Sequence, residues 1–246
     1  MKAPDVSRTA RFYEDLTAGR ESRGLWGREK RFDAERIRTR ASVRRHFESV
    51  IARYVTPADA VLDFGCGPGG FLAVAAPYCG SIAGVDVVPA FIEQCRATIA
   101  ALGFTNARAE MSDGRRIPAE AGAFDVVIMV DVLHHCEDPV GVLADVKRVL
   151  KPGGRLLIFE PNKGNPLLAL MCCLDRNEWG LLRMGSRRAY RRLLAGRFEV
   201  GEMACSGLLV GPDGRMAVAI ADFVSSAPAS RWLGWLSPKI FVAARS

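Results

Sequence analysis

The sequence contains no long hydrophobic run. No stretch of about 18 apolar residues occurs in its 246 residues, so no transmembrane helix is expected. The chain begins Met1-Lys2-Ala3-Pro4-Asp5 and continues with charged residues, without the apolar core of a signal peptide. These absences predict a cytoplasmic protein with no membrane-spanning segment, and they leave peripheral contact with a membrane surface open.

The sequence is also poor in metal-binding patterns. Its three histidines are His46, His134 and His135, and its seven cysteines show none of the paired spacings of a zinc site. An odd number of cysteines without a secretion signal favours reduced thiols. We therefore expect no bound metal, and we interpret the adjacent Cys172 and Cys173 as two small apolar residues.

The net charge of +7 is unevenly distributed along the chain. Residues 1–56 carry 14 basic and 8 acidic residues, residues 57–164 carry 9 and 13, and residues 165–246 carry 11 and 6. An acidic middle thus lies between two basic flanks. Such flanks suit an anionic substrate, an anionic membrane surface or nucleic acid, and they also suit ordinary solvated helices.

Short apolar runs alternate with helical patterns through the middle of the chain. Strands are expected at 60–64, 82–86, 107–111, 124–130 and 155–159, and helices at 41–54, 71–76, 89–102 and 139–150. A helix at 186–195 and two final strands at 198–204 and 239–244 follow. The apolar run at 124–130 indicates a strand buried on both faces. This alternation predicts an α/β fold built from βα units on a parallel sheet.

A glycine-rich turn follows the first expected strand. Residues 65–70 read Gly-Cys-Gly-Pro-Gly-Gly, and such a turn lets the backbone approach a ligand closely. Asp86 ends the next strand 23 positions after Asp63, where a carboxylate can accept hydrogen bonds from ribose hydroxyls. Pro68 interrupts the Gly-x-Gly-x-x-Gly pattern and removes a backbone donor that a pyrophosphate would use. The pattern therefore disfavours NAD.

Five segments, in order, make the chain resemble the class I S-adenosylmethionine-dependent methyltransferases. The resemblance is strongest to the small-molecule group that includes the ubiquinone and menaquinone biosynthesis enzymes. It spans about Val61 to Asn162. The matching segments are Val61–Gly70, Gly84–Asp86, Ser112–Gly114 with Ile117-Pro118, Phe124–Val127 with Asp131–His135, and Leu150–Arg155.

The resemblance implies a fold and a domain plan. The fold is a Rossmann-like, seven-stranded, mainly parallel sheet with helices on both faces and the last strand antiparallel. One methyltransferase domain spans residues 1–246, with an N-terminal helical cover at 1–56, a cofactor-binding core at 57–164, and a substrate-side lid with the final strands at 165–246.

The resemblance also implies S-adenosylmethionine as cofactor. In the implied site, Asp63 helps to fix the glycine-rich turn. Asp86 accepts hydrogen bonds from the ribose hydroxyls, and Asp113 accepts a hydrogen bond from the adenine amine. The full set of expected cofactor-binding residues is Asp63, Gly65, Gly67, Gly69, Asp86, Asp113 and Asp131. For each aspartate alone, the alternative is a turn residue or a helix cap.

His134 and His135 follow the fourth strand, at the sheet edge where open α/β sheets bind ligands. Either one is a candidate general base near neutral pH, and the alternative is packing beside the cofactor. Asp131, Glu160 and Asn162 come after strands four and five, but we interpret residues 160–162 as a turn into the lid rather than as a metal site.

The methyl acceptor is the least determined feature. The Asn/Asp-Pro-Pro-Tyr and Pro-Cys signatures of DNA methyltransferases are missing after the fourth strand, so a nucleic-acid substrate is disfavoured. Candidate covering segments are apolar with basic residues around them, and they lie at 12–14, 20–45, 166–174 and 206–237, the last with Trp232 and Trp235. We expect O-methylation of a small, apolar or lipid-like acceptor that carries an anionic group. The alternatives are an RNA methyltransferase that uses the basic flanks and a protein that binds the cofactor without catalysis.

Overall fold

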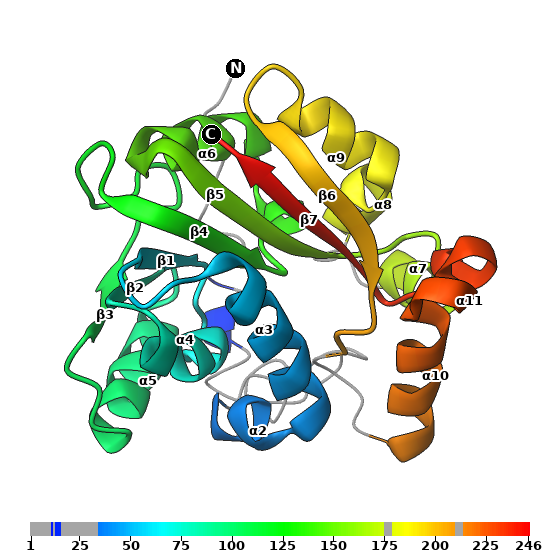
Figure 1. Cartoon of the computed structure of the whole chain (residues 1–246), viewed down its shortest axis with the longest axis horizontal. Helices are drawn as coiled ribbons and strands as arrows, with labels where there is room; N and C mark the ends of the chain where they lie inside the picture. The colour runs from blue at the N-terminus through cyan, green and yellow to red at the C-terminus, as the bar shows by residue number, and fades with distance from the viewer. Residues whose placement is uncertain (1–10, 12, 16–33, 175–178, 210–213) are drawn as a thin grey trace.

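A seven-stranded sheet in the order β3-β2-β1-β4-β5-β7-β6 forms the centre of the molecule (Figure 1). The computed structural model describes residues 11, 13–15, 34–174, 179–209 and 214–246. The strands are β1 (Ala60–Phe64), β2 (Ser81–Asp86), β3 (Ala107–Met111), β4 (Phe124–Val130), β5 (Leu150–Pro161), β6 (Glu199–Ser206) and β7 (Lys239–Arg245).

Strand direction follows the predicted plan. β1 to β5 pair in parallel, and β7 lies antiparallel between β5 and β6. The prediction of a mainly parallel seven-stranded sheet with its last strand antiparallel is thus confirmed. The chain order reverses between β1 and β4, and ligands bind at the carboxyl ends of strands beside such a switch point.

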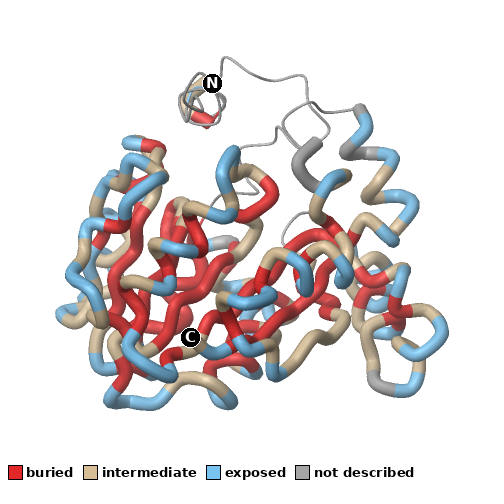
Figure 2. The backbone as a smooth tube through the Cα atoms, turned by 90° about the horizontal axis from the view of Figure 1, so that it is seen from above, coloured by how far each residue is buried: buried red, intermediate tan, exposed pale blue. Residues whose placement is uncertain are grey.

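Helices cover both faces of the sheet. In β4, Val126 and Ile128 pack into one core with α3, α4 and α5, whereas Val127 and Met129 pack into another with α6 and α9. The helices are α2 (Ala34–Thr39), α3 (Ala41–Tyr54), α4 (Gly70–Ala75), α5 (Pro89–Ala101), α6 (Pro139–Val149), α7 (Pro166–Leu174), α8 (Trp179–Met184), α9 (Arg187–Leu194), α10 (Arg215–Ser225) and α11 (Ala227–Leu233). Short 3-10 turns are η2 (Ala76–Tyr78), η3 (Leu133–His135) and η5 (Gly234–Leu236). Figure 2 shows buried backbone along the central elements and exposed backbone on the periphery.

The structure departs from the sequence prediction mainly after residue 160. β5 extends from Leu150 to Pro161, well beyond the predicted 155–159, and α7, α8, α10 and α11 lie in segments without a predicted helix. The run at 166–174 is apolar on every side and therefore lacks a helical period. The sequence nevertheless contains a helix-start signal, Asn165-Pro166. In the structure the backbone N–H of Leu168 donates to Asn165 Oδ1 (3.1 Å), and Pro166 occupies the first helical position. Within the described residues, no helix combines the length and apolar character needed to cross a bilayer.

Candidate functional site

A cavity of about 580 Å³ opens beside the carboxyl ends of β1, β2 and β4. Its walls combine the glycine-rich turn, the end of β2 and the turn after β4 with segments from the flanks of the chain. The polar and turn residues at its lining include Asp63, Gly65, Gly67, Asp86, Asp131, His134, His135 and Lys239. The topology therefore brings most of the predicted site residues to one place.

The turn at 65–69 requires glycine for two reasons. Gly65, Gly67 and Gly69 have φ of +76°, +51° and +92°, in the left-handed region that favours glycine. A Cβ at Gly65 would also lie 2.4 Å from Cγ2 of Val132, in the turn after β4. The absence of a side chain thus lets the turns after β1 and β4 approach each other.

The backbone donors of this turn are used within the protein. The N–H groups of Gly65 and Cys66 donate to the Val85 carbonyl, and that of Gly69 donates to the Cys66 carbonyl. The Gly67 N–H donates to Asp86 Oδ2 (2.9 Å), and Pro68 has no N–H. Residues 65–69 therefore present no spare backbone donors to a phosphate group, which agrees with the sequence argument against a pyrophosphate cofactor.

Two carboxylates face this turn, Asp63, which is buried, and Asp86, which is partly buried. Asp86 Oδ1 accepts from the Val88 N–H (3.0 Å), and burial raises the pKa of Asp86 above its ordinary value. Among the described residues, Asp63 Oδ2 is a buried side-chain oxygen without a hydrogen-bond partner. Burial and then the nearby charge of Asp86 raise the pKa of Asp63 to about 7. The carboxylate also accepts a hydrogen bond from the Leu72 backbone, but a buried carboxylate oxygen without a partner is costly, so Asp63 favours a cationic ligand group.

Asp113 lies apart from these residues. Its exposed carboxylate accepts from the backbone N–H groups of Arg116 (2.7 Å) and Arg115 (2.8 Å), and these bonds lower its pKa. Its neighbours Ser112 and Gly114 line the cavity, whereas Asp113 does not. The structure thus shows the turn-residue alternative for Asp113 and gives its predicted contact with adenine no support.

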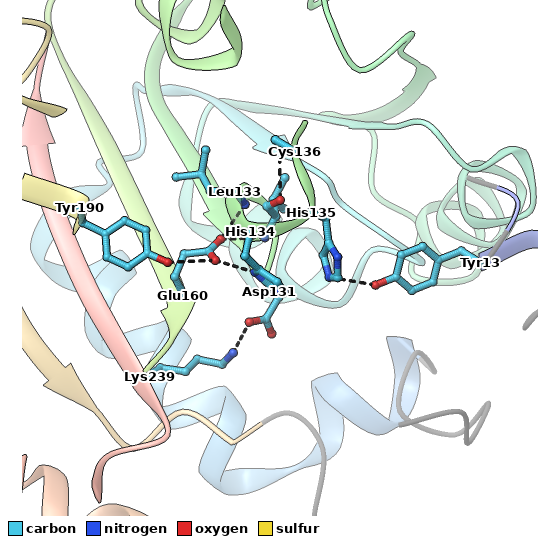
Figure 3. Close-up of polar contacts among 10 residues, drawn as sticks. Tyr13, Asp131, Leu133, His134, His135, Cys136, Glu160, Tyr190 and Lys239 are labelled. Carbon is cyan, nitrogen blue, oxygen red and sulfur yellow. Dashed lines mark hydrogen bonds and ion pairs between the residues drawn. The ribbon is translucent and has the colours of Figure 1, made fainter. Parts of the chain in front are cut away.

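His134 is held by a buried carboxylate from the neighbouring strand (Figure 3). His134 Nδ1 lies 2.6 Å from Glu160 Oε2, and both side chains are buried. Glu160 Oε1 accepts from the backbone N–H groups of Val132 (2.8 Å) and Leu133 (2.7 Å). Burial alone would raise the pKa of Glu160, but His134 and these two donors bring it below its ordinary value. Glu160 is therefore an anion that orients His134, not the turn residue that we inferred from the sequence.

His135 has a different partner from a distant part of the chain. Its Nε2 lies 3.1 Å from the Tyr13 hydroxyl, and the two rings meet edge to face. Tyr13 also packs in a small cluster with Val88 and Phe91, which follow β2. Sequence reasoning placed Tyr13 in a covering segment, and the structure puts it on the cavity wall.

Comparison with known proteins matches the middle of the chain to one kind of domain. Residues 62–158 match the family model described as "Methyltransferase domain". The chain thus contains, at residues 62–158, a methyltransferase domain similar to those of the class I S-adenosylmethionine-dependent enzymes. It is 33% identical over 106 residues to the demethylmenaquinone methyltransferase of Tropheryma whipplei, a match that covers 43% of each protein. It is 30% identical over 124 residues to the ubiquinone biosynthesis O-methyltransferase of Xanthomonas axonopodis, covering 50% of this chain and 52% of that protein.

These comparisons define the domain more closely than the acceptor. The chain spans about half or less of the length of these two curated relatives. The solved structure of the [4+2]-cyclase SpnF shares the fold, with a TM-score of 0.65 and 21% identity over 100% of this chain and 98% of the cyclase. At such low identity the likeness shows the fold alone.

Asp131 completes the polar wall of the methyltransferase cavity. Its φ of +59° is in the left-handed region, and its carboxylate pairs with the ammonium group of Lys239 at the start of β7. Asn162 Nδ2 donates to backbone carbonyls of η5 and Ser237. Asp131, Glu160 and Asn162 thus all have protein partners. Among the described residues, no three His, Cys, Asp or Glu side chains are grouped as a metal site requires.

The predicted cover contributes only part of its residues to the methyltransferase cavity. Leu168 of α7, Leu208, Leu209 and Pro238 line the cavity, as does Ile37 of the N-terminal flank. Trp232 and Trp235 do not line it, and they are exposed. Phe12 and residues 20–33 of the predicted cover lie outside the described residues.

Proposed function

We propose that this protein transfers the methyl group of S-adenosylmethionine to an oxygen of a small organic acceptor. The acceptor has an apolar body and carries an anionic group. The observation that supports this proposal most directly is the buried His134–Glu160 pair in the wall of the cavity that the glycine-rich turn also lines.

The cavity residues fit the chemical groups of this cofactor. The unpartnered oxygen of Asp63 suits the ammonium of its amino-acid end, and Asp86 suits the ribose hydroxyls. The backbone N–H groups of the turn already donate to acceptors within the protein, and this suits a cofactor without phosphates. When bound, S-adenosylmethionine would supply a methyl group on a sulfonium, whose S–CH3 bond breaks readily because the product that leaves is a neutral thioether.

His134 is the proposed general base. With its Nδ1–H donated to Glu160, its basic nitrogen is Nε2, which can take the proton of an acceptor hydroxyl. The adjacent carboxylate stabilises the imidazolium that results, as in other carboxylate–histidine pairs. The remaining contributions of the protein are alignment of the acceptor and exclusion of water.

The rest of the cavity supports an apolar acceptor with an anionic group. Phe47, Phe71, Leu168 and Leu208 give it apolar walls, and the Lys239 ammonium, which pairs with Asp131, is a mostly buried cation on its lining. The two sequence relatives are named for menaquinone and ubiquinone biosynthesis, which agrees with an apolar acceptor.

The test is transfer of labelled methyl groups to a fractionated cell extract. Label in the organic-soluble pool that resists mild base is the expected result, because an ether survives base and a carboxyl ester does not. Label in an RNA pool that disappears with ribonuclease would overturn the proposed acceptor. Binding of the cofactor without label in any pool would instead indicate a protein that binds it without transfer.

A further inference from the structure

The outward face of α10 is an unpartnered apolar stripe. Met216, Ile220 and Phe223 recur at helical spacing, and all three side chains are exposed, Phe223 by 62%. The opposite side of α10 buries Ala221 and Val224 against the protein. Because α10 already has an inner apolar face, this outer stripe is not needed for packing.

Two tryptophans follow this stripe along the chain. Trp232 of α11 is 81% exposed and Trp235 of η5 is 53% exposed. A single exposed apolar residue is ordinary, but exposed apolar residues grouped together mark interaction sites, and here two tryptophans follow an exposed apolar helix. Figure 1 shows α10 and α11 together at one flank of the molecule, with α7 beside α11.

Helix α7 connects this surface to the cavity. The Asn165 side chain at its start donates to the Leu236 carbonyl (2.6 Å), so α7 begins against η5. Leu168 lines the cavity, whereas Leu167 and Leu170 are exposed. We call the exposed side chains of these helices the apolar flank: Leu167, Leu170, Met216, Ile220, Phe223, Trp232 and Trp235.

The charges around the apolar flank are positive. Exposed Arg215 precedes Met216, and exposed Arg231 precedes Trp232. Asp222, the acidic residue of α10, is turned inward and pairs with Arg45 and His46 of α3. Exposed Arg187, at the start of α9, donates to Cys205 Sγ, which itself contacts the Gly234 carbonyl of η5, so a third arginine lies beside the tryptophans.

We propose that the apolar flank docks this protein on an anionic lipid bilayer. Exposed apolar side chains with tryptophan and arginine are the combination that inserts at the interface of a membrane and pairs with its anionic headgroups. The arginines distinguish this occupant from a second copy of the chain, because two such basic surfaces would repel each other. The docking does not depend on the reaction. If the proposed function holds, docking also places the cavity beside the compartment in which an apolar acceptor concentrates.

The experiment measures binding of the full chain to lipid vesicles by co-sedimentation. The vesicles contain phosphatidylcholine with an equal amount of phosphatidylglycerol, or phosphatidylcholine alone. We expect binding to the anionic vesicles that weakens with salt, and weaker binding to the neutral ones. The variant Phe223→Ser/Trp232→Ser should lose about tenfold or more in partition coefficient, because two large apolar side chains no longer insert.

The matched control is Met111→Ser/Val140→Ser. It removes two apolar side chains that are exposed by 42% each, at the β3 edge and on α6, away from the apolar flank. It should bind vesicles as the wild type does. Equal losses in both double variants, or no binding of the wild type to anionic vesicles, would overturn the proposal. A wild-type dimer that the Phe223→Ser/Trp232→Ser variant dissociates, without vesicle binding, would assign the apolar flank to a second copy instead.

Discussion

The two ends of the cavity are assembled from residues at very different separations in the chain. We call the end formed by residues 65–69, Asp63 and Asp86 the turn end. There, Gly67 and Asp86 are 19 positions apart and are joined through the Gly67 backbone N–H. We call the end that contains Asp131, His135 and the proposed base His134 the base end. There, Asp131 pairs with Lys239 across 108 positions, and His135 contacts Tyr13 across 122. The turn end is thus a backbone structure with two carboxylates, whereas the base end is a set of side-chain pairs between distant elements.

This difference separates binding from chemistry. Substitutions at the turn end should change backbone geometry and cofactor affinity, because the contacts there hold the turn. Substitutions at the base end should change turnover and leave the turn intact, because they remove side chains only. The predictions below test this separation, beginning with the largest expected effect.

The largest effect is expected from His134→Ala. Loss of a general base should lower kcat for a hydroxyl acceptor by about 10²–10⁴-fold, with cofactor affinity unchanged. Glu160→Gln should lower kcat by a smaller factor, because the imidazolium loses its adjacent anion. Steady-state kinetics on the labelled acceptor and calorimetric titration of the cofactor measure the two quantities.

The control at the base end is His135→Ala. His135 contacts the Tyr13 hydroxyl, whereas His134 pairs with the buried Glu160 carboxylate, so loss of His135 should cost less turnover than loss of His134. If His134→Ala keeps nearly full turnover, the base role must be withdrawn and only alignment and water exclusion remain as the mechanism.

The next effect concerns the backbone of the turn end. Gly65→Ala forces a non-glycine residue to a φ of +76° and places its Cβ against Val132, so we expect a loss of about 2–4 kcal/mol in the free energy of unfolding. Gly67→Ala shares the positive φ but meets no atom within 4 Å, so it should lose only about 1–2 kcal/mol. Chemical denaturation measures both. Equal losses would show that the approach of Val132 does not constrain the turn.

A smaller effect is expected from Asp86→Ala. The loss of two hydrogen bonds to ribose hydroxyls should weaken cofactor binding by about 1–3 kcal/mol. The matched variant Asp113→Ala removes a carboxylate that binds only its own turn, so it should leave affinity nearly unchanged. A larger loss for Asp113→Ala than for Asp86→Ala would restore the adenine contact implied by the resemblance and contradict the placement of Asp86.

The same contrast explains what the sequence could predict. β1, β3 and β4 have their predicted bounds, because apolar runs between turn residues mark buried parallel strands. Asp63, Asp86 and the glycines could be found because the turn end is local. Glu160 and Lys239 could not be assigned roles, because their partners come from other strands and no spacing encodes such pairs. The helices of the apolar flank were missed because their apolar residues occupy more than one face, so no single apolar stripe marks them in the sequence.

The last prediction concerns the pH dependence of cofactor binding. Asp63 has a pKa of about 7 in the folded protein, raised by burial and by Asp86, against an ordinary value near 3.8. Only its ionised form pairs with an ammonium, so binding below pH 7 requires the loss of a proton. Affinity should therefore rise as pH rises from 5.5 to 7, by about tenfold or less per pH unit. It should level off before the amino group of the cofactor itself loses its proton, near pH 8.

The variant Asp63→Asn tests whether Asp63 pairs with the ammonium of the cofactor, and its stability can be checked separately. Calorimetric titration should show weaker binding at pH 7.5 and a flat profile at lower pH, because no titrating carboxylate remains. The raised pKa also means that the folded state holds a proton which the unfolded chain releases at lower pH, so stability falls as pH rises through this group. The Asn variant should therefore be at least as stable as the wild type at pH 8, which excludes unfolding as the cause of weaker binding. A wild-type affinity that is independent of pH between 5.5 and 7 would show that the cofactor does not pair with Asp63, and the turn end would then bind it through Asp86 and the backbone alone.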